Sequence, residues 1–199
     1  QAPHIVIATG GRGRALPQLP IDHKKVIGYR DAMVLDKQPQ SMVIIGAGAI
    51  GVEFASFFAD MGVQVTIIEA LERILNAEDE EISALAHQAF TARGMAIHTS
   101  AKVKKLKSGA KAVEAEVEIG GKIQTLNADK VIMAVGITGN SEGLGLEGTK
   151  VKLMSGHIET DGMMRTGEPG LYAIGDITGA PWLAHKASHE GIICVEKIT

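Results

Sequence analysis

The chain has 199 residues, of which 45% are hydrophobic and 22% charged, and its formal net charge is −3. This composition is typical of a globular protein with a buried core, and it gives no electrostatic reason to expect binding to nucleic acid or to an anionic membrane. No apolar run reaches the roughly 18 residues that a membrane-spanning helix needs. The single cysteine, Cys194, excludes an internal disulfide and fits a reducing compartment.

The first segment, residues 4–8, is an apolar run that predicts a strand, and it leads into a glycine-rich loop over residues 9–13. Residues 14–28 contain prolines and predict an extended connection. Asp31 is a candidate cap for one or two helical turns. Because the chain enters a strand almost at once, we expect it to be the central part of a longer protein.

Residues 41–69 predict a strand, a glycine turn, a helix and a second strand. The run 42–45 is apolar and too short for a helix, which favours a buried parallel strand. The segment 49–61 predicts a helix that ends at Gly62, and 63–68 predicts the next strand.

Three glycines, Gly46, Gly48 and Gly51, follow the first of these strands at the G-x-G-x-x-G spacing. In such a turn the first glycine permits the tight turn, the second lets a pyrophosphate approach the backbone, and the third lets the helix pack close to the sheet. The free N–H groups at the helix start favour phosphate. Between two strands the spacing predicts a dinucleotide site. The alternatives are a glycine-rich turn in an ordinary α/β domain and a site for another adenosine ligand, such as S-adenosylmethionine.

Two acids belong to this unit. Glu69 ends the second strand, 18 residues after Gly51, where an acid accepts hydrogen bonds from an adenosine ribose. Since a carboxylate there repels a 2′-phosphate, NAD is favoured over NADP. Glu53 is expected in the first turn of the helix, where the helix dipole favours a carboxylate.

The rest of the chain alternates helix and strand signals. Residues 79–93 predict an amphipathic helix whose apolar residues recur at helical spacing, namely Ile82, Leu85, Ala86, Ala89 and Phe90. Alternating apolar and polar residues predict a three-stranded antiparallel meander over residues 103–106, 112–119 and 122–126. Further strands are expected over residues 95–98, 130–135, 151–153, 157–159 and 171–174. A glycine-rich loop is expected over 139–148 and a helix over 182–198.

Four segments together resemble the FAD- and NAD(P)-dependent pyridine nucleotide–disulfide oxidoreductases. They are residues 5–10, 46–53, 134–136 and 173–176, in the order and at the intervals usual in that family. The run Leu183-Ala-His-Lys-Ala187, with Glu190-Gly191 behind it, is most similar to the members that oxidise dihydrolipoamide. The alternatives are a glutathione-type or mercuric reductase, a transhydrogenase, and an isolated dinucleotide-binding module without activity.

The resemblance implies an α/β fold with a Rossmann-like NAD-binding domain and a three-stranded antiparallel meander at residues 36–148. Pieces of an FAD-binding domain would flank it at residues 1–35 and 149–199. Electrons would pass from dihydrolipoamide through a protein disulfide and FAD to NAD+. The implied partners are a small-molecule substrate, a second copy in a homodimer and a 2-oxo-acid dehydrogenase complex, with no nucleic acid and no membrane. The implied location is the bacterial cytosol, or the mitochondrial matrix in a eukaryote.

The resemblance also implies two sets of cofactor-binding residues. The NAD set is Gly46, Gly48, Ala49, Ile50, Gly51, Glu53, Glu69 and Gly136. The FAD set is Thr9, Gly10, Asp176, Leu183, Ala184 and His185. Glu53 would lie beside the nicotinamide, Asp176 would bond the ribityl chain, and the helix start after Leu183 would face the pyrimidine edge of the flavin.

No catalytic residue is expected in this chain. The family's redox-active cysteine pair, its FAD-binding glycine motif and its His–Glu acid/base pair have no counterpart here, so the chain alone should be inactive. Cys194 matches no redox motif and is expected in the core. Ile137 and Gly139 stand where the family often has Arg and Pro. His185 and His189 are four residues apart without a third ligand, so no metal site is expected.

Overall fold

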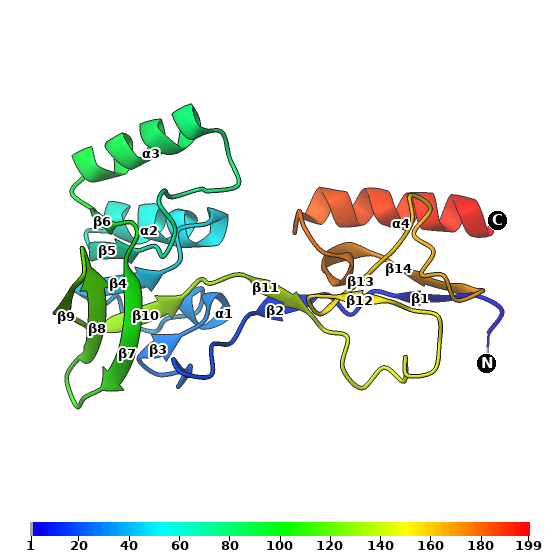
Figure 1. Ribbon diagram of the computed structural model, residues 1–199, viewed down its shortest axis with the longest axis horizontal. Helices are drawn as coiled ribbons and strands as arrows, with labels where there is room; N and C mark the ends of the chain where they lie inside the picture. Colours follow the sequence, from blue (N-terminus) through cyan, green and yellow to red (C-terminus); the bar gives the residue numbers. More distant parts are fainter. Residues whose placement is uncertain (1) are drawn as a thin grey trace. The chain divides into compact units, whose positions relative to one another are not determined.

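The computed structural model describes residues 2–199, in two compact units (Figure 1). One unit is Gly13–Gly136, and the other combines the residues up to Arg12 with Ile137–Thr199. These limits differ from the expected boundaries after residues 35 and 148. Residues 13–35 belong to the central unit because they contribute β3 (Val26–Ile27) to its sheet. Gln1, where the first expected domain begins, lies outside the described residues.

The central unit contains a five-stranded sheet in the order β3-β10-β4-β5-β6, and every neighbouring pair is parallel. The remaining strands are β4 (Ser41–Ile45), β5 (Gln64–Ile68), β6 (Ala96–His98) and β10 (Lys130–Met133). Helix α2 (Ala49–Asp60) connects β4 to β5, and α3 (Glu80–Ala92) connects β5 to β6. The chain then returns to the other side of β4. The strand order therefore reverses at β4, and open α/β sheets bind ligands at such a point.

Both faces of this sheet are buried, which explains the unbroken apolar run of β4. Met42 and Ile44 pack into one core with residues of α2, whereas Val43 and Ile45 pack into a second core. The second core also contains Val113, Ala115 and Val117 from the antiparallel meander. A strand covered on both faces needs apolar side chains at every position rather than at alternate ones.

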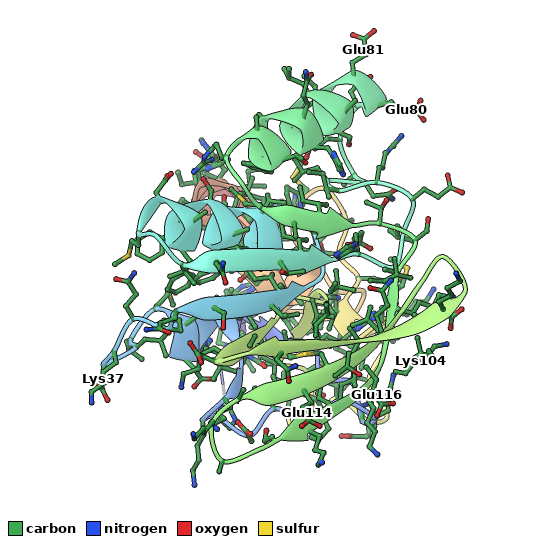
Figure 2. The ribbon with its side chains drawn as sticks, turned by 90° about the vertical axis from the view of Figure 1, so that its left-hand side faces the viewer. Lys37, Glu80, Glu81, Lys104, Glu114 and Glu116 are labelled. Carbon is green, nitrogen blue, oxygen red and sulfur yellow. The ribbon has the colours of Figure 1, made fainter. Side chains whose placement is uncertain are left out.

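The meander consists of β7 (Lys102–Ser108), β8 (Val113–Ile119) and β9 (Lys122–Ala128), paired antiparallel as predicted. Alternate residues of β8 are the glutamates Glu114 and Glu116, which are exposed and project outward, as does Lys104 of β7 (Figure 2). The alternation in this segment therefore separates a core-facing side from a charged outer side.

The predictions for α1 and α3 are wrong in detail. Asp31 is not the residue that precedes α1 (Tyr29–Ala32). It lies inside the helix, and its carboxylate accepts a 2.9 Å bond from the N–H of Gly28. In α3, Ile82 and Leu85 are 53% and 64% exposed. Ser83 faces inward instead, because its hydroxyl donates to the carbonyl of Leu75 at 3.1 Å.

The other unit is built from short elements. Strand β1 (Ile5–Ile7) pairs in parallel with β14 (Leu171–Ala173), and β12 (Leu153–Met154) pairs antiparallel with β13 (His157–Ile158). Strands β2 (Gly11–Gly13) and β11 (Ile137–Gly139) form a further pair, although a loop was expected at residues 9–13 and no strand was predicted at 137–139. A 3₁₀ turn, η1 (Gly175–Thr178), precedes α4 (Ala184–Ile198).

Cys194 lies on the inner side of α4 in a small core with Tyr172 and Met164. The prediction that it is a core residue is confirmed. Burial raises the pKa of its thiol, which disfavours the reactive thiolate. None of the helices within residues 2–199 is long and apolar enough to cross a membrane.

Candidate functional site

The glycine turn after β4 lies where the carboxyl ends of β4 and β10 meet. The N–H of Ala134, just past β10, donates to the carbonyl of Ile45 at 2.8 Å. Gly46 has φ +101°, and a Cβ there would lie 2.3 Å from the carbonyl oxygen of Ala134. The position therefore requires glycine both for its conformation and for the close approach of the two strand ends.

Gly51 and Gly48 differ in what surrounds them. A Cβ on Gly51 would lie 1.9 Å from the carbonyl oxygen of Gly46, so α2 packs directly onto the turn. A Cβ on Gly48 would meet nothing within 4 Å, and its φ of −71° is open to any residue. No contact within the described residues requires glycine at position 48. The open space where a Cβ would lie leaves room for a ligand beside the backbone.

The start of α2 provides donors at the same place. Gly48 is the N-cap residue, and no side chain caps the helix. The first N–H groups of a helix have no partner within it, so those of Ala49 and Ile50 are available to an anion. Gly48 and Ala49 are exposed and Ile50 is half-buried, which makes this end of α2 accessible.

Glu69, at the end of β5, is buried and bonded to the glycine turn. One of its carboxylate oxygens, Oε2, accepts a 2.6 Å bond from the N–H of Ala47, and the other, Oε1, accepts a 2.8 Å bond from the N–H of Leu71. Each carboxylate oxygen has a second lone pair that a ligand hydroxyl could use. The hydrogen bond between Ala47 and Glu69 was not predicted from the sequence, because the two residues are 22 positions apart in the chain.

Glu53 does not lie in the first turn of α2, so that expectation was wrong. The helix begins at Ala49, its first turn contains no acidic residue, and Glu53 is its fifth residue. The attraction of a helix dipole falls off within the first turn, so the dipole does not explain a carboxylate here. The Glu53 side chain is exposed.

Gly136 follows β10 at the same edge of the sheet as Gly46. Its φ is +112°, and a Cβ there would meet nothing within 4 Å. Its carbonyl accepts a 2.9 Å bond from the N–H of Arg14, which fixes the backbone. The structure thus gathers the predicted residues at positions 46–51, 69 and 136 at one edge of the central sheet.

In the other unit, the segment at Thr9 and Gly10 is fixed by Asn140. The Thr9 hydroxyl donates to the Asn140 carbonyl at 2.8 Å, and the Asn140 N–H donates to the Gly10 carbonyl at 3.0 Å. Strand β2 then passes beside η1, since a Cβ on Gly11 would lie 3.3 Å from the Cβ of Asp176. Gly11 therefore lies beside Asp176, and Thr9 and Gly10 directly precede Gly11 in the chain.

Asp176 is half-buried in η1, and its carboxylate accepts no hydrogen bond from any residue in the described range 2–199. A half-buried carboxylate without a partner is a ready acceptor for a ligand hydroxyl. The start of α4 lies close by, because the ammonium of Lys186 donates to the carbonyl of Gly175 at 3.2 Å.

The first turn of α4 is exposed and has no side-chain cap. Leu183 is the N-cap residue, followed by Ala184 and His185, so the free N–H groups there resemble those at the start of α2. His185 and His189 are both exposed. Within residues 2–199 no group of three or more His, Cys, Asp or Glu residues could hold a metal ion.

Comparisons with known proteins identify the family of this chain. The family model described as pyridine nucleotide-disulphide oxidoreductase matches residues 1–191. A dihydrolipoyl dehydrogenase of Rhizobium etli is 50% identical over 198 residues, covering 99% of this chain and 41% of the relative. One of Chlorobaculum tepidum is 45% identical, covering 99% and 42%. The chain thus spans less than half the length of these relatives.

Solved structures of flavoprotein disulfide reductases and related proteins have the same fold as this chain. LpdA from Mycobacterium tuberculosis is 27% identical with a TM-score of 0.89, covering 98% of this chain and 42% of that one. The HOCl-induced flavoprotein disulfide reductase RclA from Escherichia coli is 26% identical with a TM-score of 0.87, covering 98% and 44%. With a family model matched over nearly its whole length, the chain belongs to the pyridine nucleotide-disulphide oxidoreductase family.

Proposed function

We propose that this chain is the dinucleotide-binding part of a dihydrolipoamide dehydrogenase, with an NAD site in the central unit and part of an FAD site in the other unit. The observation that carries the proposal is the bond between Glu69 and Ala47, which brings a carboxylate to the glycine turn at the switch point of the sheet. The identity of 50% to a dihydrolipoyl dehydrogenase favours this member of the family over the reductases.

The residues of the central unit would bind and orient the dinucleotide. The open side of Gly48 would admit the pyrophosphate, and the uncapped N–H groups of Ala49 and Ile50 would donate to it. The lone pairs of Glu69 that are still free would accept the adenosine ribose hydroxyls. Gly136 would let the backbone approach the nicotinamide half, and the exposed Glu53 carboxylate would lie beside it.

The residues of the other unit would hold part of the flavin. Asp176 would accept a ribityl hydroxyl, Thr9 and Gly10 would contact the cofactor next to it, and the uncapped start of α4 would favour negative charge on the ring. The cofactors supply the hydride and electron chemistry, and these residues position them.

For the whole enzyme, we propose dihydrolipoamide as the small-molecule substrate and NAD+ as the acceptor. We also propose that the whole enzyme is a homodimer and that it binds to a 2-oxo-acid dehydrogenase complex. Its proposed location is the bacterial cytosol. The bacterial origin of the relatives supports the last point.

Calorimetric titration of the 199-residue chain with NAD+ and NADP+ tests the NAD site. We expect NAD+ to bind on the order of 10-fold more tightly, since the Glu69 carboxylate repels a 2′-phosphate. Glu69→Gln keeps the side-chain volume and one oxygen acceptor, and it should narrow this preference. Glu72→Gln removes a charge from an exposed position three residues away and should leave the preference unchanged.

Equal affinity of the unaltered chain for both dinucleotides would contradict the role of Glu69. Absence of binding to either would contradict the whole assignment. The chain should also fail to reduce lipoamide, because its one cysteine is buried and cannot form a redox pair.

A further inference from the structure

Lys186 and Glu190 lie one helical turn apart near the start of α4 and form an ion pair of 2.9 Å. Their side chains are only 18% and 13% exposed, whereas the pair Arg12–Glu142 in the same unit is 45% and 68% exposed. Removing two charges from water costs free energy that their mutual attraction offsets only when further hydrogen bonds complete the arrangement. The further hydrogen bonds of Lys186 and Glu190 therefore indicate what the ion pair does.

The Lys186 ammonium donates to three oxygens of the neighbouring 3₁₀ turn. These are the hydroxyl of Thr178 at 2.7 Å, the carbonyl of Gly179 at 3.0 Å and the carbonyl of Gly175 at 3.2 Å. With Glu190 the ammonium has four oxygen partners for its three N–H groups, so no donor is left without an acceptor. Lys186 thus binds both ends of η1, Gly175 and Thr178, through one ammonium group.

Glu190 binds the same turn through a backbone N–H group. One of its carboxylate oxygens, Oε2, accepts a 2.7 Å bond from the N–H of Gly175. Both backbone polar atoms of Gly175 are therefore held by the ion pair, in a residue whose φ is +78°. The next residue in the chain is Asp176, and among the described hydrogen bonds and ion pairs of Lys186 and Glu190 none involves its carboxylate.

We propose that Lys186 and Glu190 are positioning residues that fix the backbone of η1, so that Asp176 presents its carboxylate to the flavin ribityl chain. This inference rests on the proposed FAD site. Because the carboxylate of Asp176 accepts no hydrogen bond from the described residues, its direction is set through the backbone of Gly175. An ion pair that is largely removed from water is often no more stabilising than apolar residues of similar volume, so its contribution here is the geometry of the turn.

The test uses the complete enzyme that contains this chain. The double variant Lys186→Met with Glu190→Leu replaces the pair by apolar side chains of similar volume. We expect its dissociation constant for FAD, measured by flavin fluorescence on reconstitution of the apoenzyme, to rise on the order of 10-fold. Hydrogen exchange at the amide of Gly175 should accelerate, while exchange in β14 stays unchanged. A matched control, Lys197→Met with Glu196→Leu, alters exposed residues of the same helix and should change neither quantity.

Asp176→Ala separates this inference from the proposed function. If Lys186 and Glu190 act through Asp176, the double variant should add little to the loss of FAD affinity in an Asp176→Ala background. Losses that are fully additive, or an unchanged FAD affinity in the double variant when Asp176→Ala is impaired, would overturn the positioning role alone. An unchanged affinity in Asp176→Ala would overturn the FAD assignment and the positioning role together.

Glu190→Gln keeps the test decisive if the double variant does not fold. It retains an oxygen acceptor for the N–H of Gly175, so it should keep more FAD affinity and slower exchange at Gly175 than Glu190→Leu. Equal values for Glu190→Gln and Glu190→Leu would contradict the proposal.

Discussion

At the residue scale, the glycines of the turn after β4 fall into two kinds. Gly46 and Gly51 are required by contacts inside the protein, since a Cβ on either would overlap a carbonyl oxygen. Gly48 has open space on the side where a Cβ would lie. The spacing of the three glycines predicted these separate roles, whereas the atoms that enforce them, the carbonyl oxygens of Ala134 and Gly46, could be identified only in the structure.

Gly48→Ala and Gly51→Ala therefore form a matched pair of variants. We expect Gly51→Ala to lower the free energy of unfolding by about 3 kcal/mol or more, because the added methyl group overlaps the backbone of Gly46. Gly48→Ala should cost less than about 1 kcal/mol at this N-cap position. It should nevertheless weaken NAD+ binding on the order of 10-fold, because the methyl group occupies the place of the pyrophosphate.

Urea unfolding and NAD+ titration measure these two effects separately. An NAD+ affinity in Gly48→Ala equal to that of the unaltered chain would contradict the assignment of the phosphate site. Gly62→Ala is a suitable reference for backbone strain, since Gly62 also has open space around it but ends α2 with a φ of +86°.

At the scale of elements, the sequence predicted most of the strands and helices, including the two-residue strand β13, but it missed β2, β3 and β11. The apolar run of β4 and the alternation of β8 identify those strands because each pattern follows directly from which faces are covered. Strands β2, β3 and β11 have only two or three residues, too few for a periodic pattern, and exist through pairing with distant partners. The inner face of α3 was predicted only in part, since Ala86 and Phe90 pack against the core, whereas Ile82 is exposed and Ser83 is buried.

The turn before β3 depends on the ionised carboxylate of Asp22. Its Oδ1 accepts bonds from the N–H groups of Lys24, Lys25 and Val26 at 2.8, 2.7 and 2.9 Å, and its Oδ2 accepts one of 2.8 Å from the hydroxyl of Ser108. Burial opposes ionisation, but these bonds together outweigh it and lower the pKa of Asp22 from 3.8 to about 2.

Because the folded-state pKa of Asp22 is lower than that of the unfolded chain, its contribution to stability is present above about pH 4 and is lost as the pH falls toward 2. We expect the unaltered chain to melt at a higher temperature than Asp22→Asn near pH 6, and the difference to shrink between about pH 4 and pH 2. Thermal unfolding followed by circular dichroism over that range measures it. A difference that does not depend on pH would contradict the role of the charge.

At the scale of the whole molecule, the two units differ in how completely their strands are supported. Strands β4, β5 and β10 have a partner on both sides or a core on both faces. Strands β1 and β14 form a two-stranded pair, and Ile5 and Val6 of β1 are exposed. A two-stranded pair is marginally stable by itself, so the stability of the chain should be unevenly distributed.

Hydrogen exchange of the isolated chain tests this difference. We expect the amides of β4 and β10 to exchange more slowly than those of β1 and β14, by at least about 10-fold, because opening the central sheet exposes two cores. Similar protection in both units would show that they unfold together. Addition of NAD+ should slow exchange chiefly in the central unit, which carries the proposed site.

The insertion of the meander between β6 and β10 has a consequence for folding order. Lys130 of β10 pairs with Met42 of β4, so the two strands that form the switch point are separated by most of the central unit. Contacts between residues so far apart in the chain form late, because closing the long loop between them costs conformational entropy before any contact offsets it. Strands β4, β5 and β6 can associate through their helices while β10 is still unpaired. The edge at which Gly46 meets Ala134 would then be completed in one of the last steps, and recovery of dinucleotide binding would report the end of refolding rather than its beginning.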